Sequence, residues 1–147
     1  MFKHILIPTD GSPVADKAAK AGIKLAMEIG ARVTGYYAVE AIQPRVYGEG
    51  YMMGRETIAE LEKRALAVGK TFLAAMAKQA KAAGVRFDPV CGTVATPYEG
   101  IIDTARKKKC DVIFMASHGR RGLAGLLMGS VTHKVLSHSK VPVIVYR

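Results

Sequence analysis

A glycine-rich segment is the part of the chain whose residue types most clearly suggest chemistry. It runs from Ala116 to Ser130 and reads ASHGRRGLAGLLMGS. Glycine lets backbone N–H groups come close to an anion and adopt positive φ, so such a segment can form a concave anion-binding nest. Gly129 and Ser130 are predicted to open a helix whose positive end faces the same space, and Ser130 adds a hydroxyl. We therefore predict a phosphate-binding loop.

This loop differs from two familiar nucleotide motifs. It holds no Gly-x-x-x-x-Gly-Lys-Ser/Thr sequence, so it is not a Walker A loop. It holds no Gly-x-Gly-x-x-Gly either, which argues against dinucleotide binding. Arg120 and Arg121 could clamp phosphates or could simply be solvated, and the segment itself could be a plain connector.

Two further positions could contact a ligand near the same loop. Asp10 follows the first apolar run and could bond a ribose hydroxyl or help to hold a divalent metal. It could equally form a turn with Gly11 and Ser12. Backbone groups at Ala38, near the end of the second apolar run, could meet the edge of an adenine.

The elements that must position these residues are strands and helices in alternation. Near-continuous apolar runs of strand length are typical of a parallel sheet that is covered on both faces. We predict strands at Phe2–Thr9, Arg32–Glu40, Val85–Cys91, Asp111–Ser117 and Val141–Tyr146. Pro89 lies inside the third run, so that strand either sits at an edge or begins after the proline.

Helix-capping residues separate the strands. Ser12 is a predicted N-cap, Pro13 suits the first helical position, and Gly30 can end that helix. Thr96 and Glu99 form a predicted capping box for a helix that ends at Lys107–Lys109. Two more helices are predicted at Glu56–Ala83, with a buried stripe of Ile58, Leu61, Ala65, Val68, Phe72 and Met76, and at Ser130–Ser137. Residues 41–55 fit neither period and are predicted to be a long mobile excursion, either a lid or part of a partner surface.

This alternation predicts one α/β domain over residues 1–147. We expect an open, mostly parallel five-stranded sheet with helices on both faces, which is a Rossmann-like arrangement. Ligands bind such sheets beyond the carboxyl ends of the strands, where the strand order reverses. The segments that end the first, second and fourth strands should therefore converge on one site.

Composition bounds the other possibilities. The 147 residues carry 22 Lys+Arg and 12 Asp+Glu, a net charge of 22 − 12 = +10, and half of them are hydrophobic. This composition argues against a disordered chain and against a disulfide scaffold. Cys91 and Cys110 do not have the spacing of a metal or redox motif. We find neither a signal-peptide pattern nor a membrane-length apolar run, so we expect a cytoplasmic protein with no membrane partner. The basic excess allows a nucleic-acid partner, but no recognised motif supports one.

The chain resembles the universal stress proteins across its full length. The resemblance rests on ILIPTDGS at the first strand, on SHGRRGLAGLLMGSVTHKVL, and on the closing VPVIVYR. Nucleotide-binding members of the family carry Gly-x2-Gly-x9-Gly-Ser/Thr after the fourth strand. Here Gly119 and Gly129-Ser130 keep the spacing, while Ala116 replaces the first glycine. A negative φ would accommodate this alanine without strain, whereas a positive φ would cost about 1 kcal/mol.

The resemblance implies a dimeric regulatory stress-response protein with the adenine nucleotide alpha-hydrolase-like fold, which binds ATP with Mg or Mn. Asp10 and Ala38 would then serve the ribose and the adenine, and Gly119, Gly129 and Ser130 the phosphates. The full predicted site is Pro8, Thr9, Asp10, Ala38, Val39, Met115, Ala116, Ser117, His118, Gly119, Arg120, Arg121, Gly122, Gly129, Ser130 and Val131. The alternative is an adaptor of the same fold that binds no nucleotide and acts through protein partners, and Ala116 motivates it.

The resemblance also implies a homodimer formed through the last strand, with Val141, Val143 and Val145 at the contact. The downstream regulatory partner is unknown. The histidines have no metal spacing and the serines lie in no nucleophile elbow. We therefore predict no catalytic set and at most slow ATP hydrolysis.

Overall fold

A five-stranded parallel sheet forms the centre of the molecule. The computed structural model describes residues 1–43, 46–47, 51–52, 54–119 and 128–147. The strands lie in the order β5-β2-β1-β6-β7. Their bounds are His4–Pro8 for β1, Arg32–Glu40 for β2, Phe87–Val94 for β5, Val112–Ala116 for β6 and Val143–Tyr146 for β7. The predicted open, parallel five-stranded sheet is thereby confirmed.

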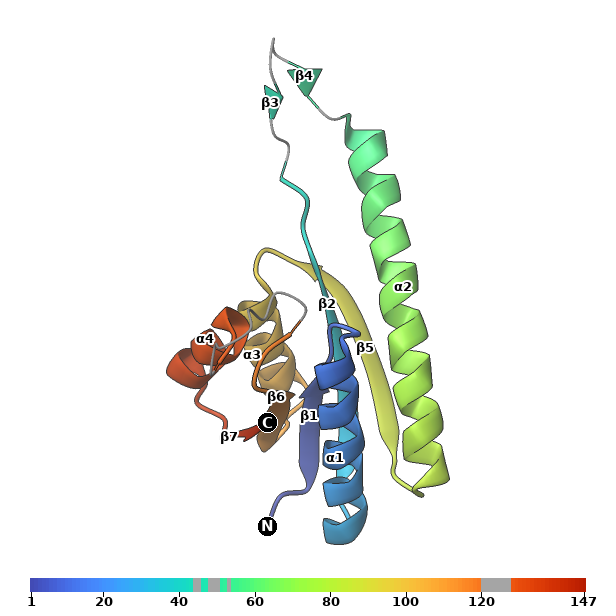
Figure 1. Cartoon of the computed structure of the whole chain (residues 1–147), viewed down its shortest axis with the longest axis vertical. Coiled ribbons are helices and arrows are strands. Elements are labelled where there is room, and N and C mark those ends of the chain that lie inside the picture. Colours follow the sequence, from blue (N-terminus) through green and yellow to red (C-terminus); the bar gives the residue numbers. More distant parts are fainter. Residues whose placement is uncertain (44–45, 48–50, 53, 120–127) are drawn as a thin grey trace.

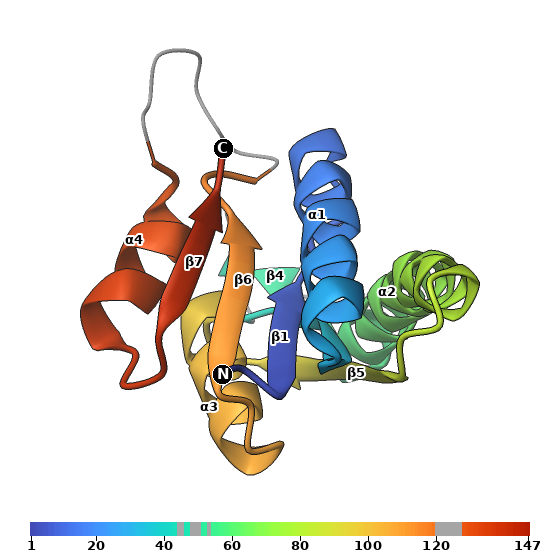
Figure 2. The ribbon, with the colours of Figure 1, turned by 90° about the horizontal axis from the view of Figure 1, so that it is seen from below.

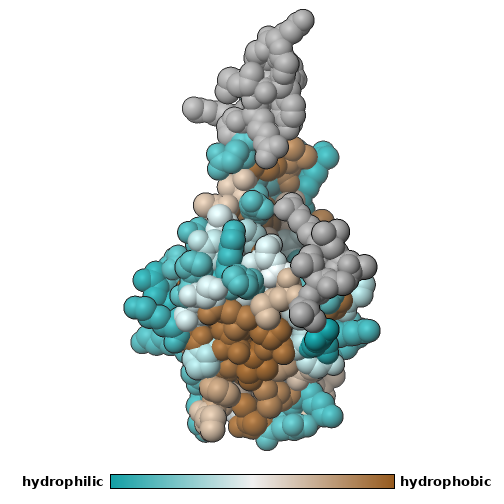
Figure 3. Space-filling model, turned by 60° about the vertical axis from the view of Figure 1, so that its left-hand side comes forward, coloured by the Kyte–Doolittle hydropathy of each residue, from teal (hydrophilic) through white to brown (hydrophobic). Residues whose placement is uncertain are grey.

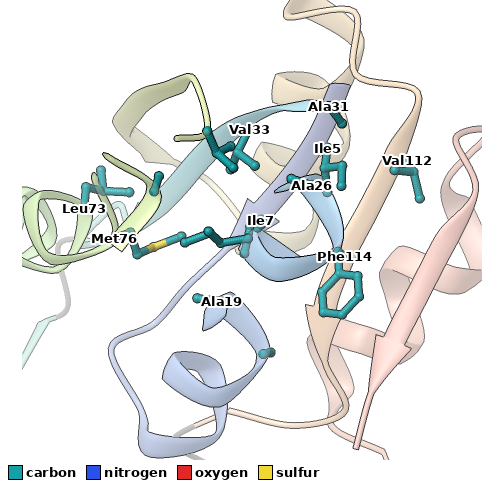
Figure 4. Close-up of a cluster of buried hydrophobic side chains, with 14 of the residues drawn as sticks. Ile5, Ile7, Ala19, Ala26, Ala31, Val33, Leu73, Met76, Val112 and Phe114 are labelled. Carbon is teal, nitrogen blue, oxygen red and sulfur yellow. The ribbon is translucent and has the colours of Figure 1, made fainter. Parts of the chain in front are cut away.

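Helices cover both faces of this sheet, as predicted (Figure 2). On one face lie α1 (Pro13–Ile29) and α2 (Arg55–Ala82), and on the other lie α3 (Pro97–Lys107) and α4 (Ser130–His138). Alternate residues of β1 supply the two cores: Ile5 and Ile7 pack toward α1 and α2, and Leu6 packs toward α3 and α4. Figure 4 shows the first core, where Ile7 lies beside Met76 of α2. Burial of both faces is the main stabilising contribution in such a layered fold.

The start of α1 follows its local sequence closely. Ser12 is the N-cap, and its hydroxyl accepts a hydrogen bond from the N–H of Ala15 at 3.2 Å. Pro13 occupies the first turn, and Gly30 ends the helix with a left-handed φ of 67°. Gly11 before the cap has a φ of 77°, and a Cβ there would overlap the ring of Phe72 on α2. The chain therefore turns from β1 into α1 at a point where only glycine fits.

The buried stripe predicted for α2 is correct for only part of the helix. Met76 is buried, together with Leu73, but Leu61 and Val68 are 37% and 46% exposed. Figure 1 shows that the N-terminal part of α2 extends past the sheet, toward the two short antiparallel strands β3 (Val46–Tyr47) and β4 (Tyr51–Met52). Val68 is exposed although its neighbour Gly69 lies against the ring of Tyr37 on β2. An apolar period indicates a helix, but it does not tell how far the neighbouring sheet reaches. The hairpin within residues 41–55 was not predicted as strands.

The two edges of the sheet differ. β5 forms one edge, and Pro89 lies within the strand instead of before it. The carbonyl of Arg86 accepts a hydrogen bond from the N–H of Val33 on β2. Because backbone groups alternate in direction along a strand, those of Pro89 face the open side of β5, where the ladder needs no N–H. β7 forms the other edge and pairs only with β6 in the described sheet.

One predicted cap has a different geometry. Thr96 is the N-cap of α3, but its hydroxyl donates to the carboxylate of Glu99 at 2.5 Å and accepts no backbone N–H. The two side chains therefore bond each other instead of capping the backbone reciprocally.

Among the described residues, none of the helices combines the length and the apolar character that crossing a bilayer would require.

His4 is a buried polar residue at the amino end of the sheet. Its Nε2 lies 2.7 Å from Oγ1 of Thr34 on β2. Burial lowers the pKa of His4 below its usual 6.5, the charge of Arg32 lowers it further, and Asp111 opposes the change. The folded protein thus holds this imidazole neutral.

We expect the free energy of unfolding to fall as the pH drops below 6.5, because the unfolded chain then takes up a proton that folded His4 resists. Urea unfolding at neutral and mildly acidic pH would measure the loss. His4→Gln, which keeps a hydrogen-bonding group for Thr34, should reduce it. His133→Gln, which removes an exposed histidine of α4, is the control, and equal pH dependence in both variants would contradict the assignment.

Candidate functional site

A cavity of about 530 Å³ opens at the carboxyl ends of the strands. It lies where the strand order reverses, because β1 is followed along the chain by its neighbour β2 on one side, and β6 begins the other half of the sheet. Residues from the ends of β1, β2 and β6 line it together with the first turns of α3 and α4. They are Pro8, Thr9, Asp10, Ala15, Tyr36, Tyr37, Ala38, Glu40, Thr96, Pro97, Tyr98, Ile101, Met115, Ala116, His118, Gly119, Gly129, Ser130, Val131, Thr132 and Lys134.

The N-terminus of α4 forms one wall of the cavity. Gly129 is the N-cap and cannot cap with a side chain, and Ser130 is the first helical residue. Backbone N–H groups in a first turn have no partner within the helix, and the helix dipole adds positive potential there. The backbone of this turn, with the hydroxyl of Ser130, is therefore suited to bind an anion.

The end of β6 holds this helix terminus in place. The N–H of Gly129 donates to the carbonyl of Ser117 at 2.7 Å, and the hydroxyl of Thr132 donates to the carbonyl of Ala116 at 2.9 Å. A Cβ on Gly129 would lie 3.1 Å from Cα of His118. This glycine thus allows the backbones of Gly129 and His118 to pack closely, in addition to any contact with a ligand.

Asp10 occupies the opposite wall. Its Oδ1 accepts the N–H of Ser12 at 2.9 Å, and the hydroxyl of Thr9 accepts the N–H of Gly11 at 3.1 Å. A Cβ on Gly119 would overlap Oδ2 of Asp10, so the loop backbone lies directly against this carboxylate. The turn and the ligand-binding interpretations of Asp10 are compatible, because the same carboxylate fixes the turn and lines the cavity.

Apolar residues line the side of the cavity between β2 and α3, including Ala38, Pro97 and Ile101. The carbonyl of Tyr36 accepts from the N–H of Thr9 at 2.9 Å, so alternation directs the N–H and C=O groups of Ala38 to the same side. β1 pairs with β2 only as far as Tyr36 and does not reach Ala38. A planar heterocycle could therefore lie against apolar side chains while its edge bonds the backbone of Ala38.

Most of the predicted site residues line this cavity. Val39 and Ser117 do not: both are buried, and the hydroxyl of Ser117 lies 2.9 Å from Nδ1 of His118. Arg120, Arg121 and Gly122 lie outside the described residues. Ala116 is the last residue of β6, and Lys109 is the only non-glycine residue with positive φ in the described ranges. Alanine at the first motif position therefore carries no backbone strain.

Sequence reasoning missed the wall built by α3 and by the second turn of α4. Thr96, Pro97 and Tyr98 follow β5, whose carboxyl end lies at the same edge as the other strand ends, and this position was the available signal. Lys134 follows Ser130 by one helical turn, so it shares that face of α4. Tyr36 and Glu40 alternate with Ala38 along β2, which places their side chains on the same face of the sheet.

The charged side chains of the cavity are of both signs. Asp10 and Glu40 are its carboxylates, and Nζ of Lys134 lies 5.3 Å from the centre of the Tyr98 ring. Within the described ranges, no three His, Cys, Asp or Glu side chains come together as a metal site would require. Any metal here would depend on oxygen atoms from a ligand.

Comparison with known proteins identifies the family. Residues 1–147 match the model of the universal stress protein family. A universal stress protein of Methanocaldococcus jannaschii is 36% identical over 147 residues, which cover 100% of this chain and 83% of the relative. The chain belongs to the universal stress protein family.

Solved universal stress proteins share this fold. The universal stress protein UspA from Lactobacillus plantarum superposes with a TM-score of 0.85 at 22% identity, covering 99% of this chain and 98% of that one. Another universal stress protein, in complex with cAMP, gives 0.71 at 21% identity over 99% and 97%. A family protein from Arabidopsis thaliana, with AMP bound, gives 0.68 at 14% identity over 97% and 90%. At these identities the likeness shows the fold.

We expect Gly129→Ala to lower the free energy of unfolding by about 1–3 kcal/mol, because its Cβ would press on the backbone of His118. Gly92→Ala on β5 is the matched control, since a Cβ there meets no atom within 4 Å. Its stability should equal or slightly exceed that of the wild type. Urea unfolding of the three proteins measures the difference, and equal stability of the two variants would contradict close packing at Gly129.

Proposed function

We propose that this universal stress protein is a cytoplasmic, dimeric regulatory protein that binds an adenine nucleotide in the cavity between β1, β6 and α4. One observation carries the proposal: the first turn of α4, with Gly129 as a cap that has no side chain, faces a cavity whose other side is apolar. An anion at the helix terminus and a flat apolar group at Ala38 together describe a nucleotide. The relatives solved with cAMP and with AMP support this ligand class.

ATP is the nucleotide we propose, with Mg²⁺ or Mn²⁺. A cavity of about 530 Å³ is within the size range of small-molecule sites. Mg²⁺ usually binds one or two carboxylates together with substrate phosphates, and Asp10 and Glu40 are the carboxylates available in the cavity wall. The last three positions of the family motif are present at Gly119, Gly129 and Ser130, and Ala116 at its first position has no positive φ.

The alternative function is an adaptor of the same fold that binds no nucleotide. Ala116 is its motivation: this residue carries no backbone strain, but its methyl group lines the cavity where the family has glycine. Denaturing the purified protein and identifying released small molecules by mass spectrometry separates the two functions. A released adenine nucleotide supports the proposal, and an empty protein that also fails to bind added ATP supports the adaptor.

The dimer that we propose forms at the β7 edge. The carbonyls of Pro142 and Tyr146 accept from β6, so Val143 and Val145 direct their backbone groups to the open side of the sheet. Figure 3, which brings the side of α4 and β7 forward, shows a broad apolar patch at the height of β7. An open edge beside apolar surface favours pairing with a second copy.

We expect Ser130→Pro to weaken ATP binding about tenfold, because it removes one phosphate-binding N–H from the first turn. Proline is tolerated at the first helical position, and Gly129, with φ −74° and ψ 157°, already has the backbone that precedes proline. Ser130→Ala keeps the N–H and should lose less affinity. Calorimetric titration measures both. Wild-type affinity in the proline variant, at equal thermal stability, would exclude this N–H from the site.

We expect Val145→Pro to convert the dimer to a monomer, because it removes an N–H on the open side of β7 without removing one from the β6 ladder. Val145→Thr retains the N–H and should remain dimeric. Sedimentation velocity measures both states. A wild-type monomer, or a proline variant that stays dimeric, would contradict pairing through this strand.

A further inference from the structure

Lys134 is a cavity residue for which the proposed contacts provide no role. It lines the cavity together with Ser130, which lies one turn earlier on the same face of α4. A helical side chain leans toward the N-terminus of its helix. From this position the flexible side chain of Lys134 can reach the end of α4 that we propose binds phosphate.

Lys134 forms no ion pair with a described carboxylate, although Asp10 and Glu40 line the same cavity. Its Nζ instead lies 5.3 Å from the centre of the Tyr98 ring on α3, the helix packed beside α4 (Figure 2). The ring of His138 on α4 also lies beside the Tyr98 ring, with centroids 5.3 Å apart.

The two available partners of this ammonium differ in strength. A cation over an exposed aromatic ring gains about 0.5–1 kcal/mol. A charge-assisted hydrogen bond to phosphate is stronger, and it places the positive charge where the helix terminus has already gathered negative charge. A phosphate entering the cavity would therefore draw the ammonium away from the ring.

We propose that Lys134 binds a phosphate of the ligand and makes the site select nucleoside phosphates over uncharged nucleosides. Tyr98 holds the ammonium at the cavity rim until the ligand enters. This inference rests on the proposed nucleotide-binding function, and it adds to that function a residue that determines ligand charge. The backbone N–H groups of α4 position the phosphate, and Lys134 supplies the full positive charge that they lack.

The experiment compares ATP with adenosine by calorimetric titration. Lys134→Met keeps the length and apolar stem of the side chain but removes its charge, and should weaken ATP binding about tenfold while leaving adenosine binding unchanged. Lys134→Arg should retain most of the ATP affinity. Lys140→Met is the matched control, because it removes one exposed positive charge outside the cavity wall.

Each outcome has a separate meaning. A wild-type protein that binds neither ATP nor adenosine overturns the proposed function itself. A wild-type protein that binds ATP while Lys134→Met binds it equally well overturns only the role of Lys134. Equal loss of ATP and adenosine affinity assigns the residue to packing, and an equal loss of ATP affinity in Lys140→Met assigns the effect to net charge. Both results would also overturn the inference.

Discussion

The hydrogen bond from Gly129 to Ser117 is the contact on which the site depends. At 2.7 Å it joins the start of α4 directly to the end of β6, and the hydroxyl of Thr132 adds a second tie to the carbonyl of Ala116. The helix terminus is thereby placed by the sheet.

The opposite wall of the cavity, at Asp10, is also fixed by a few short contacts. Asp10 fixes the turn into α1 through the N–H of Ser12, and Gly119 lies against its carboxylate. A backbone segment after β6 and a side chain after β1 thus meet across the point where the strand order reverses.

Much of this arrangement could be predicted from the sequence, because strand period, caps and glycine positions are local signals. Ser12, Pro13 and Gly30 each have the role that their residue types indicate. The errors arose where distant contacts decide. Leu61 and Val68 have a helical apolar period, but their side chains are partly exposed in the folded protein. Tyr98 and Lys134 line the cavity because α3 and α4 pack together, and no spacing within either segment reveals that contact. Whether Ala116 is strained depends on a φ value that the sequence does not contain.

The contrast between the two sheet edges limits how copies of this protein can associate. β5 presents Pro89 to its open side, so a strand approaching that edge would meet a missing donor in the middle of the ladder. β7 presents intact backbone groups, together with valine side chains. Association through sheet edges would therefore be favoured at β7 over β5, and a two-fold pairing through β7 alone would be closed. A fibre built by continued strand addition would also need the β5 edge, where Pro89 has no N–H to offer an added strand.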